Sequence, residues 1–192
     1  MSKEKILLVG GGGHCHSVID VIELENKYDI IGIVDKKELI GSDILGYKVI
    51  ASDNDLETLF KKCTNAVVTV GQIKSNTIRV KLFEKLKKIG FSLPIIKSPL
   101  AYISKYTSLG EGTIIMHHSL INSNVSIGKN CIINTKALIE HDVIVKDNCH
   151  ISTAAVVNGG VVVNEGTFFG SNAVSKEAVE VQGFIKAGSL VK

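Results

Sequence analysis

Three consecutive residues in the second half of the chain, Glu140, His141 and Asp142, carry the side chains that general acid–base catalysis uses. An imidazole with a carboxylate on either side can be oriented by one of them and made more basic by their charge. A general base that removes a proton from an amine or a hydroxyl needs this setting. His141 is therefore the candidate base, with the neighbouring carboxylates as its candidate partners.

A second candidate site is the glycine run at residues 10–13, which follows an apolar segment and precedes a predicted helix. Backbone without side chains can closely approach a phosphate at the N-terminus of such a helix. The third glycine of a dinucleotide fingerprint would fall at Cys15, so NAD is disfavoured. We favour ligand binding here, and a glycine-rich turn that merely connects strand and helix is the alternative.

Polar residues near this glycine run allow two further interpretations. Asp35 ends the second predicted strand, where an acidic residue often contacts a ribose or a base, although such a residue is as often a helix cap or a turn residue. His14 and His16 flank Cys15, but no second cluster of metal ligands lies nearby in sequence. We therefore predict no metal site.

A six-residue repeat must position the histidine site. From Ile103 an Ile, Leu or Val, or in one case a Phe, recurs at every sixth position for most of the remaining chain, and a small or β-branched residue lies two positions before each. A helix has period 3.6 and a strand period 2, whereas a short strand plus a corner has period 6 and three such sides close a triangular coil of eighteen residues. The series departs from the pattern at Ser175 and Ala187. Its members are Ile103, Leu109, Ile115, Ile121, Ile127, Ile133, Ile139, Val145, Ile151, Val157, Val163, Phe169 and Val181.

Residues eighteen apart should therefore lie about 4.8 Å apart, one strand spacing, in adjacent coils. Gly159 is eighteen residues after His141, so bare backbone with approachable N–H groups should neighbour the imidazole. Such an amide suits a developing oxyanion. His150 is half a coil from His141, so a pocket that contains both histidines would be assembled across a subunit interface.

The residues that precede each inward position predict an oligomer. They should point outward, and Ile114, Ile132 and Phe168 lie in this column together with His150. Large apolar side chains on an outer face are best explained by contact with another copy of the chain. His150 as a simple interface residue is the alternative to a role in the site.

Before Ile103 the pattern changes to alternating strands and helices. The patterns predict strands at residues 5–9, 30–34, 66–70 and 93–96, and helices at 17–25, 53–62 and 75–89. This alternation is typical of a small doubly wound parallel sheet. Pro94 and Pro99 bracket the change, so we predict one domain at residues 1–98 and a second at 99–192.

Composition indicates a cytoplasmic protein. The 192 residues are 45% hydrophobic, which is ample for two modest cores. The net charge of +3 is small and the lysines are dispersed, so neither nucleic acid nor membrane is expected as the main partner. The four cysteines lack C-x-x-C spacing, the N-terminus does not read as a signal peptide, and no apolar run approaches the roughly 20 residues of a membrane helix.

Taken together, these residues resemble a known family over essentially the whole chain. The hexads resemble the left-handed β-helix of hexapeptide acyltransferases. The leading strand and residues 10–14 are similar to the G-x-G-G-H loop of the NeuD/PglD-like sugar acyltransferases, and residues 139–142 with His150 match that family's active-site spacing. The resemblance implies an α/β N-terminal domain with a small Rossmann-like parallel sheet, followed by a left-handed parallel β-helix.

The resemblance also implies roles for individual residues. It implies His141 as the catalytic base, Asp142 as its acidic partner, and His150 and Gly159 beside the thioester of acetyl-CoA, the cosubstrate. Family members are homotrimers that bind acetyl-CoA in the groove between neighbouring β-helices, and no metal is implied. The residues implied to bind a nucleotide sugar are Gly11, Gly12, Gly13, His14, Asp35 and Gly71.

Two segments depart from the family pattern. Lys36 follows Asp35 where some relatives have a second acidic residue, and residues 187–192 replace the usual C-terminal G-x-P-A-K. We predict an acetyl-CoA-dependent N-acetyltransferase that acts on the amine of a nucleotide-activated amino sugar. O-acetylation of a sialic-acid-like sugar and a noncatalytic scaffold that binds a nucleotide sugar are the alternatives.

Overall fold

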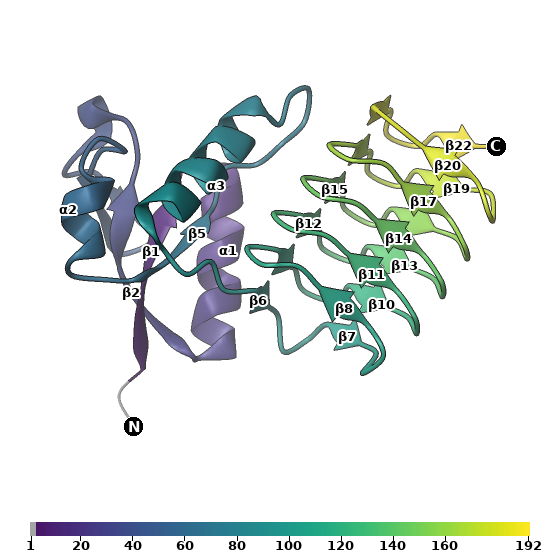
Figure 1. The fold of residues 1–192 in the computed structure, drawn as a ribbon, viewed down its shortest axis with the longest axis horizontal. Coiled ribbons are helices and arrows are strands. Elements are labelled where there is room, and N and C mark those ends of the chain that lie inside the picture. The colour runs from purple at the N-terminus through teal and green to yellow at the C-terminus, as the bar shows by residue number, and fades with distance from the viewer. Residues whose placement is uncertain (1–2) are drawn as a thin grey trace. The chain divides into compact units, whose positions relative to one another are not determined.

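The computed structural model describes residues 3–192. The described residues divide into two compact units, one formed by residues 3–71 together with 77–94, the other by residues 72–76 together with 95–192 (Figure 1). Within residues 3–192, no helix has both the length and the apolar character that crossing a membrane requires.

The first unit is an α/β layer built on a five-stranded sheet in the order β3-β4-β2-β1-β5. Strands β1, β2, β4 and β5 run parallel, and β3 pairs antiparallel with β4 at the edge. The strands are β1 Glu4–Val9, β2 Tyr28–Val34, β3 Asp43–Ile44, β4 Tyr47–Ala51 and β5 Asn65–Val68, and the helices are α1 Gly13–Glu25, α2 Leu56–Phe60, α3 Thr77–Ile89 and a 3₁₀ turn at Lys37–Leu39.

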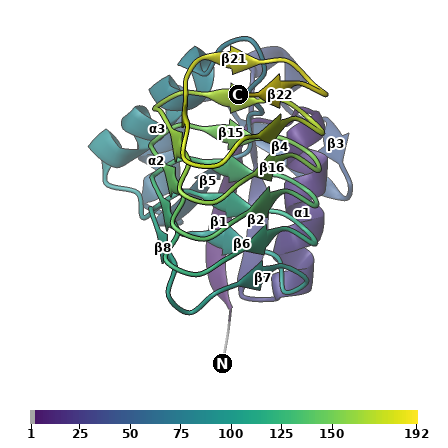
Figure 2. The same ribbon diagram turned by 90° about the vertical axis from the view of Figure 1, so that its right-hand side faces the viewer.

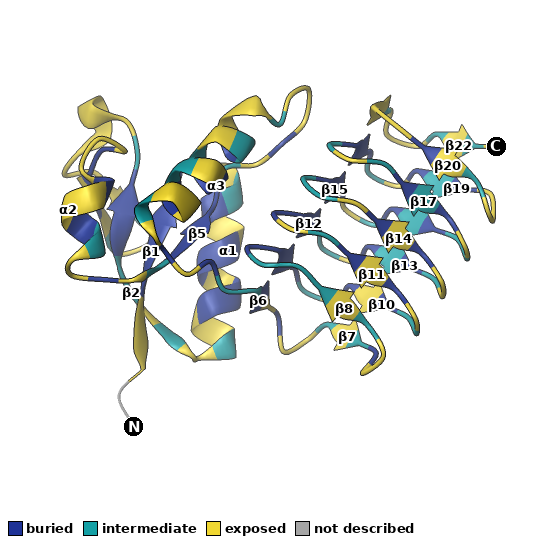
Figure 3. Ribbon diagram, viewed as in Figure 1, coloured by how far each residue is buried: buried dark blue, intermediate teal, exposed yellow. Residues whose placement is uncertain are grey.

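The apolar run of β1 explains its position inside the sheet, between β2 and β5. Residues 6–9 are buried, as expected for a parallel strand covered on both faces (Figure 3). Val9 is followed by Gly10, whose φ of +110° is a backbone conformation that favours glycine. The chain can therefore turn directly from the buried strand into the loop that precedes α1.

The sheet differs from the predicted one in three strands. The β3–β4 hairpin was not predicted, because its turn uses Leu45 and Gly46 with φ of 52° and 88°, and leucine is a weak signal for such a turn. The strand predicted at 93–96 is wrong. Pro94 lacks an N–H donor, and the chain instead forms β6 at Ile96–Lys97, which pairs with β9 of the second unit.

All three α-helices begin at other residues than predicted, and α3 starts at Thr77 rather than at residue 75. Helix α2 starts at Leu56, because Asp55 accepts hydrogen bonds from the N–H and the hydroxyl of Ser52 in a turn that precedes it. Helix α1 starts at Gly13 rather than at residue 17, so the last glycine of the loop already belongs to the helix. The N-terminus of α1 consequently lies inside the glycine run.

The second unit is a left-handed parallel β-helix of two-residue strands in three sheets, drawn from its C-terminal end in Figure 2. We name the sheets by their first strands. The β6 sheet contains β6, β9 (Ile114–Ile115), β12 (Ile132–Ile133), β15 (His150–Ile151), β18 (Phe168–Phe169) and β21 (Phe184–Ile185). The β7 sheet contains β7 (Tyr102–Ile103), β10 (Leu120–Ile121), β13 (Leu138–Ile139), β16 (Val156–Val157), β19 (Val174–Ser175) and β22 (Leu190–Val191). The β8 sheet contains β8 (Ser108–Leu109), β11 (Ser126–Ile127), β14 (Ile144–Val145), β17 (Val162–Val163) and β20 (Glu180–Val181).

The predicted register of eighteen residues is confirmed through most of the β-helix. Ile133 pairs with Ile151, and Ile139 pairs with Val157. The last coil is two residues shorter, because Phe169 pairs with Ile185. This shortening explains why Ala187 departs from the six-residue series.

Most corners of the β-helix repeat one backbone conformation. The corner residue three positions after the inward residue has a positive φ, near 60°, in which Asn, Asp and Gly are favoured over other residues. Asp142 has φ of 61° and so occupies one of these corners. The members from 124 onward are Asn124, Asn130, Lys136, Asp142, Asn148, Ala154, Gly160, Gly166, Asn172, Ala178 and Gly188.

The predicted exposed patch around His150 is wrong. Ile114 and Ile132 are fully buried, and His150 and Phe168 are 6% and 9% exposed. His150 is covered because its ring bonds to the carbonyl of Gln72, in the 72–76 loop of the same unit, and Phe168 stacks on Phe184 with ring centroids 5.2 Å apart. Neither contact can be inferred from the six-residue repeat.

An apolar outer column lies instead on the β7 sheet. Its members are aligned by the strand pairing, and each precedes an inward residue. All are exposed or half-buried, with Tyr102 62% and Leu190 63% exposed (Figure 3). The column, which we call the β7 stripe, consists of Tyr102, Leu120, Leu138, Val156, Val174 and Leu190.

Candidate functional site

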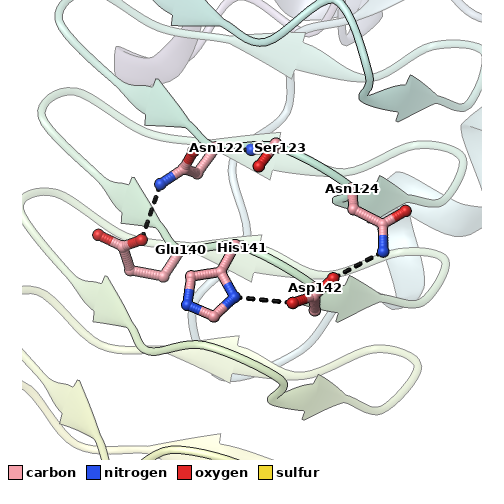
Figure 4. Close-up of polar contacts among 6 residues, drawn as sticks. All are labelled: Asn122, Ser123, Asn124, Glu140, His141 and Asp142. Atoms are coloured by element: carbon pink, nitrogen blue, oxygen red, sulfur yellow. Dashed lines mark hydrogen bonds and ion pairs between the residues drawn. The ribbon is translucent and has the colours of Figure 1, made fainter.

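His141 lies at the corner that follows β13, and its ring is hydrogen-bonded to the next residue. The distance from His141 Nδ1 to Asp142 Oδ2 is 2.7 Å (Figure 4). An ionised carboxylate only accepts hydrogen bonds, so Nδ1 carries the proton and Nε2 keeps its lone pair. Both side chains are more than half exposed, so Nε2 is accessible to a substrate proton.

Both carboxylates beside His141 are held by asparagines of the preceding coil. Asn124 Nδ2 donates to Asp142 Oδ1 at 2.6 Å, and Asn122 Nδ2 donates to Glu140 Oε2 at 2.8 Å (Figure 4). Each asparagine is eighteen residues before its carboxylate. The coil register therefore brings two amides under the site.

These contacts shift the pKa values of the pair in opposite directions. The hydrogen bond to Asp142 is the main cause that raises the pKa of His141, and the charges of Asp142 and Glu140 add to it, while partial desolvation opposes them. The pKa of Asp142 is lowered, chiefly by the amide of Asn124 and then by His141. Asp142 therefore stays ionised, and His141 becomes a stronger base than an isolated imidazole.

Gly159 lies against the His141 ring, as the eighteen-residue spacing predicts. A Cβ placed on Gly159 would lie 2.9 Å from His141 Cε1 and 3.0 Å from Nε2, closer than real Cβ contacts. The N–H of Gly160 donates to the carbonyl of His141 at 3.0 Å. Among residues 3–192 the N–H of Gly159 has no protein hydrogen-bond partner. Bare backbone and an available amide thus adjoin the imidazole.

His150 is not brought to His141 within one chain. Its Nδ1 lies 2.6 Å from the carbonyl oxygen of Gln72, so Nδ1 carries the proton, and its Nε2 lies 3.1 Å from Asn134 Nδ2. Gln72 Nε2 also donates to the carbonyl of Gly166. His150 thus holds the 72–76 loop in place. Its partner Gln72 is 78 residues away in the chain, and no sequence pattern predicts this contact. A place for His150 beside acetyl-CoA stays a prediction.

The first unit contains a cavity of about 460 Å³ at the carboxyl ends of β1 and β2. Its lining includes every residue that the sequence suggested for substrate binding, namely Gly11, Gly12, Gly13, His14, Asp35 and Gly71. Lys36 also lines it, as do Asp53 and Leu82, which were not singled out from the sequence. The cavity lies where open α/β sheets bind ligands.

Asp35 fastens the glycine loop. Its Oδ2 accepts the N–H of Gly11, and its Oδ1 accepts the N–H of Lys36 at 2.6 Å. A Cβ on Gly11 would lie 2.9 Å from Asp35 Oδ2, so this close approach requires glycine. Gly12 and Gly13, in contrast, have no protein atom within 4 Å of a Cβ position. Open backbone at the N-terminus of α1 thus borders the cavity, an arrangement that favours an anionic ligand.

The residues around His14 do not form a metal site. No group of three or more His, Cys, Asp or Glu side chains in the described part of the chain is arranged to hold a metal ion. Cys15 is buried, and burial raises the pKa of its thiol to about 11. A protonated thiol is a poor metal ligand.

Comparisons with known proteins add a family and several relatives. The PglD N-terminal domain family matches residues 5–86. No curated protein matches the sequence. PerB from Caulobacter crescentus, solved in complex with CoA and GDP-perosamine, is 31% identical with a TM-score of 0.90, over 100% of this chain and 90% of that chain. A histidine-to-asparagine variant of perosamine N-acetyltransferase from the same organism, also with CoA and GDP-perosamine, is 30% identical with a TM-score of 0.92 over the same shares.

A further solved structure is similar at lower identity. The acetyltransferase domain of PglB from Neisseria gonorrhoeae FA1090, in complex with acetyl coenzyme A, is 25% identical with a TM-score of 0.90. The match covers 99% of this chain and 93% of that chain. Both units of this chain are therefore present in the relatives.

Proposed function

Because the chain belongs to the NeuD/PglD-like family of sugar acyltransferases, we propose that it transfers an acetyl group from acetyl-CoA to the amine of a nucleotide-activated amino sugar. The observation that carries this proposal is the His141 ring, whose Nδ1 is held by Asp142 and whose Nε2 adjoins the bare backbone of Gly159. The relatives that bind CoA and GDP-perosamine support the substrate classes.

The proposed reaction is a direct attack. His141 Nε2 removes a proton from the sugar amine as the nitrogen attacks the carbonyl carbon of the thioester. The N–H of Gly159 donates to the developing oxyanion. The new C–N bond then replaces the C–S bond, and the imidazolium returns its proton to the departing CoA sulfur. Acetylated sugar, CoA and neutral His141 result.

We assign the nucleotide sugar to the cavity of the first unit. Gly12 and Gly13 offer unhindered backbone at the N-terminus of α1 for a diphosphate, and Asp35 keeps the loop in this form. His14 and Gly71 line the same cavity. The order of strand, glycine loop and helix is the usual frame for nucleotide phosphates.

We also propose a cytoplasmic homotrimer. The β7 stripe exposes apolar side chains along one sheet of the β-helix, which a second copy of the chain would cover. The acetyl-CoA would lie between neighbouring β-helices, with His150 and Gly159 near its thioester. None of the four cysteines, all of which lie within residues 3–192, forms a disulfide, which fits a reducing compartment.

The deciding experiment measures acetyl transfer directly. We would incubate the purified chain with acetyl-CoA and UDP-, GDP- or CMP-linked amino sugars, or sialic acid, and record thiol release and product mass. A gain of one acetyl group on an amine, lost in His141→Ala, would support the proposal. His118→Ala removes an exposed corner histidine with no proposed role and should retain turnover.

Two other outcomes would overturn the proposal. Turnover with sialic acid alone would indicate O-acetylation, which needs the same base. Nucleotide-sugar binding without thiol release across the panel would indicate a noncatalytic scaffold.

A further inference from the structure

We propose that Asn124 is a positioning residue of the acetyl transfer, because it aims the Asp142 carboxylate at Nδ1 of His141. The inference rests on the proposed function of His141 as general base. It adds a third member to the pair that the sequence suggested, and the three side chains form one continuous line of hydrogen bonds (Figure 4).

The direction of each hydrogen bond follows from the chemistry of the groups. Asn124 Nδ2 is a donor, so Asp142 Oδ1 is the acceptor at 2.6 Å. With Oδ1 engaged, Oδ2 faces His141 Nδ1 at 2.7 Å and accepts the hydrogen bond from its N–H. Each carboxylate oxygen thus has one protein partner, and the amide fixes the rotation of the carboxylate about its Cβ–Cγ bond.

The backbone of Asp142 is held by the same coil. Its N–H donates to the carbonyl of Ser123 at 3.2 Å. The side chain of Asp142 is nevertheless 54% exposed, so without Asn124 the carboxylate would be free to turn toward water. Asn124 supplies the side-chain restraint that the corner backbone does not.

The turn itself does not require an asparagine at position 124. Asn124 has φ of 58°, and Ala154, Gly160 and Ala178 occupy equivalent corner positions with φ of 54°, 69° and 52°. The β-helix therefore accommodates residues without an amide at this conformation. Removal of the Asn124 side chain should leave the coil intact while it breaks the hydrogen-bond line.

The charges that face His141 come from its own corner. Glu140 and Asp142 flank it, the preceding coil presents the neutral residues Asn122, Ser123 and Asn124, and the following coil presents the backbone of Gly159. Glu140 raises the pKa of His141 through its charge, whereas Asp142 does so mainly by a hydrogen bond. Loss of Asn124 should therefore act through the Asp142 bond.

The test is Asn124→Gly, which suits a positive φ and removes the amide. We expect kcat to fall roughly tenfold, because a misplaced base lowers kcat less than the absence of the base does. KM for both substrates should stay within about twofold of the value for the unmodified chain. A weaker hydrogen bond from His141 to Asp142 lowers the pKa of His141. The rise of kcat with pH and the ¹⁵N NMR titration of His141 should therefore both move to lower pH. Asn172→Gly, at an exposed corner with φ of 54°, is the matched control and should change neither.

The outcomes separate positioning from a structural role. A loss of kcat without a shift of the His141 titration would show that Asn124 only supports the coil, and would overturn the inference, as would unchanged kcat and titration. Retained turnover in His141→Ala would instead overturn the proposed function. The NMR titration of Asn124→Gly does not depend on turnover, so the two failures are distinguishable.

Discussion

At the scale of single residues, the basicity of His141 comes from its partners rather than from burial. The ring is exposed, and the pKa of His141 is raised chiefly by the hydrogen bond to Asp142. An exposed base can meet a substrate without any rearrangement of the corner. The hydrogen bond meanwhile selects the tautomer in which Nε2 is unprotonated.

This pairing predicts the pH dependence of the reaction. Only neutral His141 can accept a proton, so kcat should rise with pH through an apparent pKa above the ordinary histidine value. Asp142→Asn should lower kcat about a hundredfold. It should also shift the rise of kcat to lower pH, because the carboxylate that raises the pKa of His141 is lost. Its Oδ1 would still accept from Asn124, so its Nδ2 would face His141 Nδ1 and favour the wrong tautomer.

The measurement is kcat against pH for both proteins at saturating substrates. If kcat of Asp142→Asn rises with the same apparent pKa as kcat of the unmodified chain, the assignment of this pKa to His141 is contradicted.

Gly159 predicts a second effect at this scale. In Gly159→Ala the new Cβ would lie 2.9 Å from His141 Cε1, so the imidazole must move away from its present position. We expect kcat to fall at least tenfold, while the melting temperature stays within about 2 °C because the ring is exposed and can shift. Steady-state kinetics and thermal unfolding check this. Unchanged kcat in Gly159→Ala would show that the working position of the imidazole does not depend on bare backbone at residue 159.

At the scale of elements, adjacent residues of the glycine loop have different surroundings. Gly11 approaches Asp35 and holds the loop, whereas Gly12 borders the cavity with no protein atom near its Cβ position. Gly12→Ala should leave thermal stability unchanged. Its methyl group should raise KM for the nucleotide sugar about tenfold and leave KM for acetyl-CoA unchanged, since close phosphate contact needs bare backbone. An equal rise in both KM values would argue against phosphate binding at this loop.

The 72–76 loop depends on one histidine of β15. The bond from His150 Nδ1 to the Gln72 carbonyl is buried, and loss of one such bond changes a local opening equilibrium by about tenfold. His150→Ala should therefore accelerate amide hydrogen exchange at residues 72–76 by about that factor. Asn134→Ala removes the partner of Nε2 and leaves the Gln72 bond, so exchange there should stay close to that of the unmodified chain. Equal exchange in His150→Ala and the parent would show that other contacts hold the loop.

At the scale of the whole molecule, the β7 stripe predicts the assembly. Leu138→Lys places a charge in the middle of the stripe and should reduce the mass in solution from about three times to once the chain mass of 20.6 kDa. Turnover should fall with it if acetyl-CoA binds between copies. Light scattering after size-exclusion chromatography measures the mass. Leu24→Lys, at an exposed leucine of α1, is the matched control, and an unchanged mass in Leu138→Lys would exclude the stripe as the interface.

The sequence by itself determined the β-helix and the neighbours of His141. Regular coils of eighteen residues convert sequence separation into spatial adjacency, so Ile133 meets Ile151 and His141 meets Gly159 without knowledge of any other contact. The glycine loop and Asp35 were likewise predicted to lie together. Their position at neighbouring parallel strand ends follows from the βαβ order, and the cavity contains them all.

Only the tertiary structure decided which outer column is covered and how the histidines are held. The repeat treats all outward positions alike, yet His150 is buried by a loop 78 residues away while Tyr102 stays exposed. The register places Asn124 beside Asp142, but whether the amide or another atom meets the carboxylate depends on side-chain rotation. A six-residue pattern predicts which side chains point into the coil. Contacts between segments far apart in the sequence depend instead on the path of the chain between them.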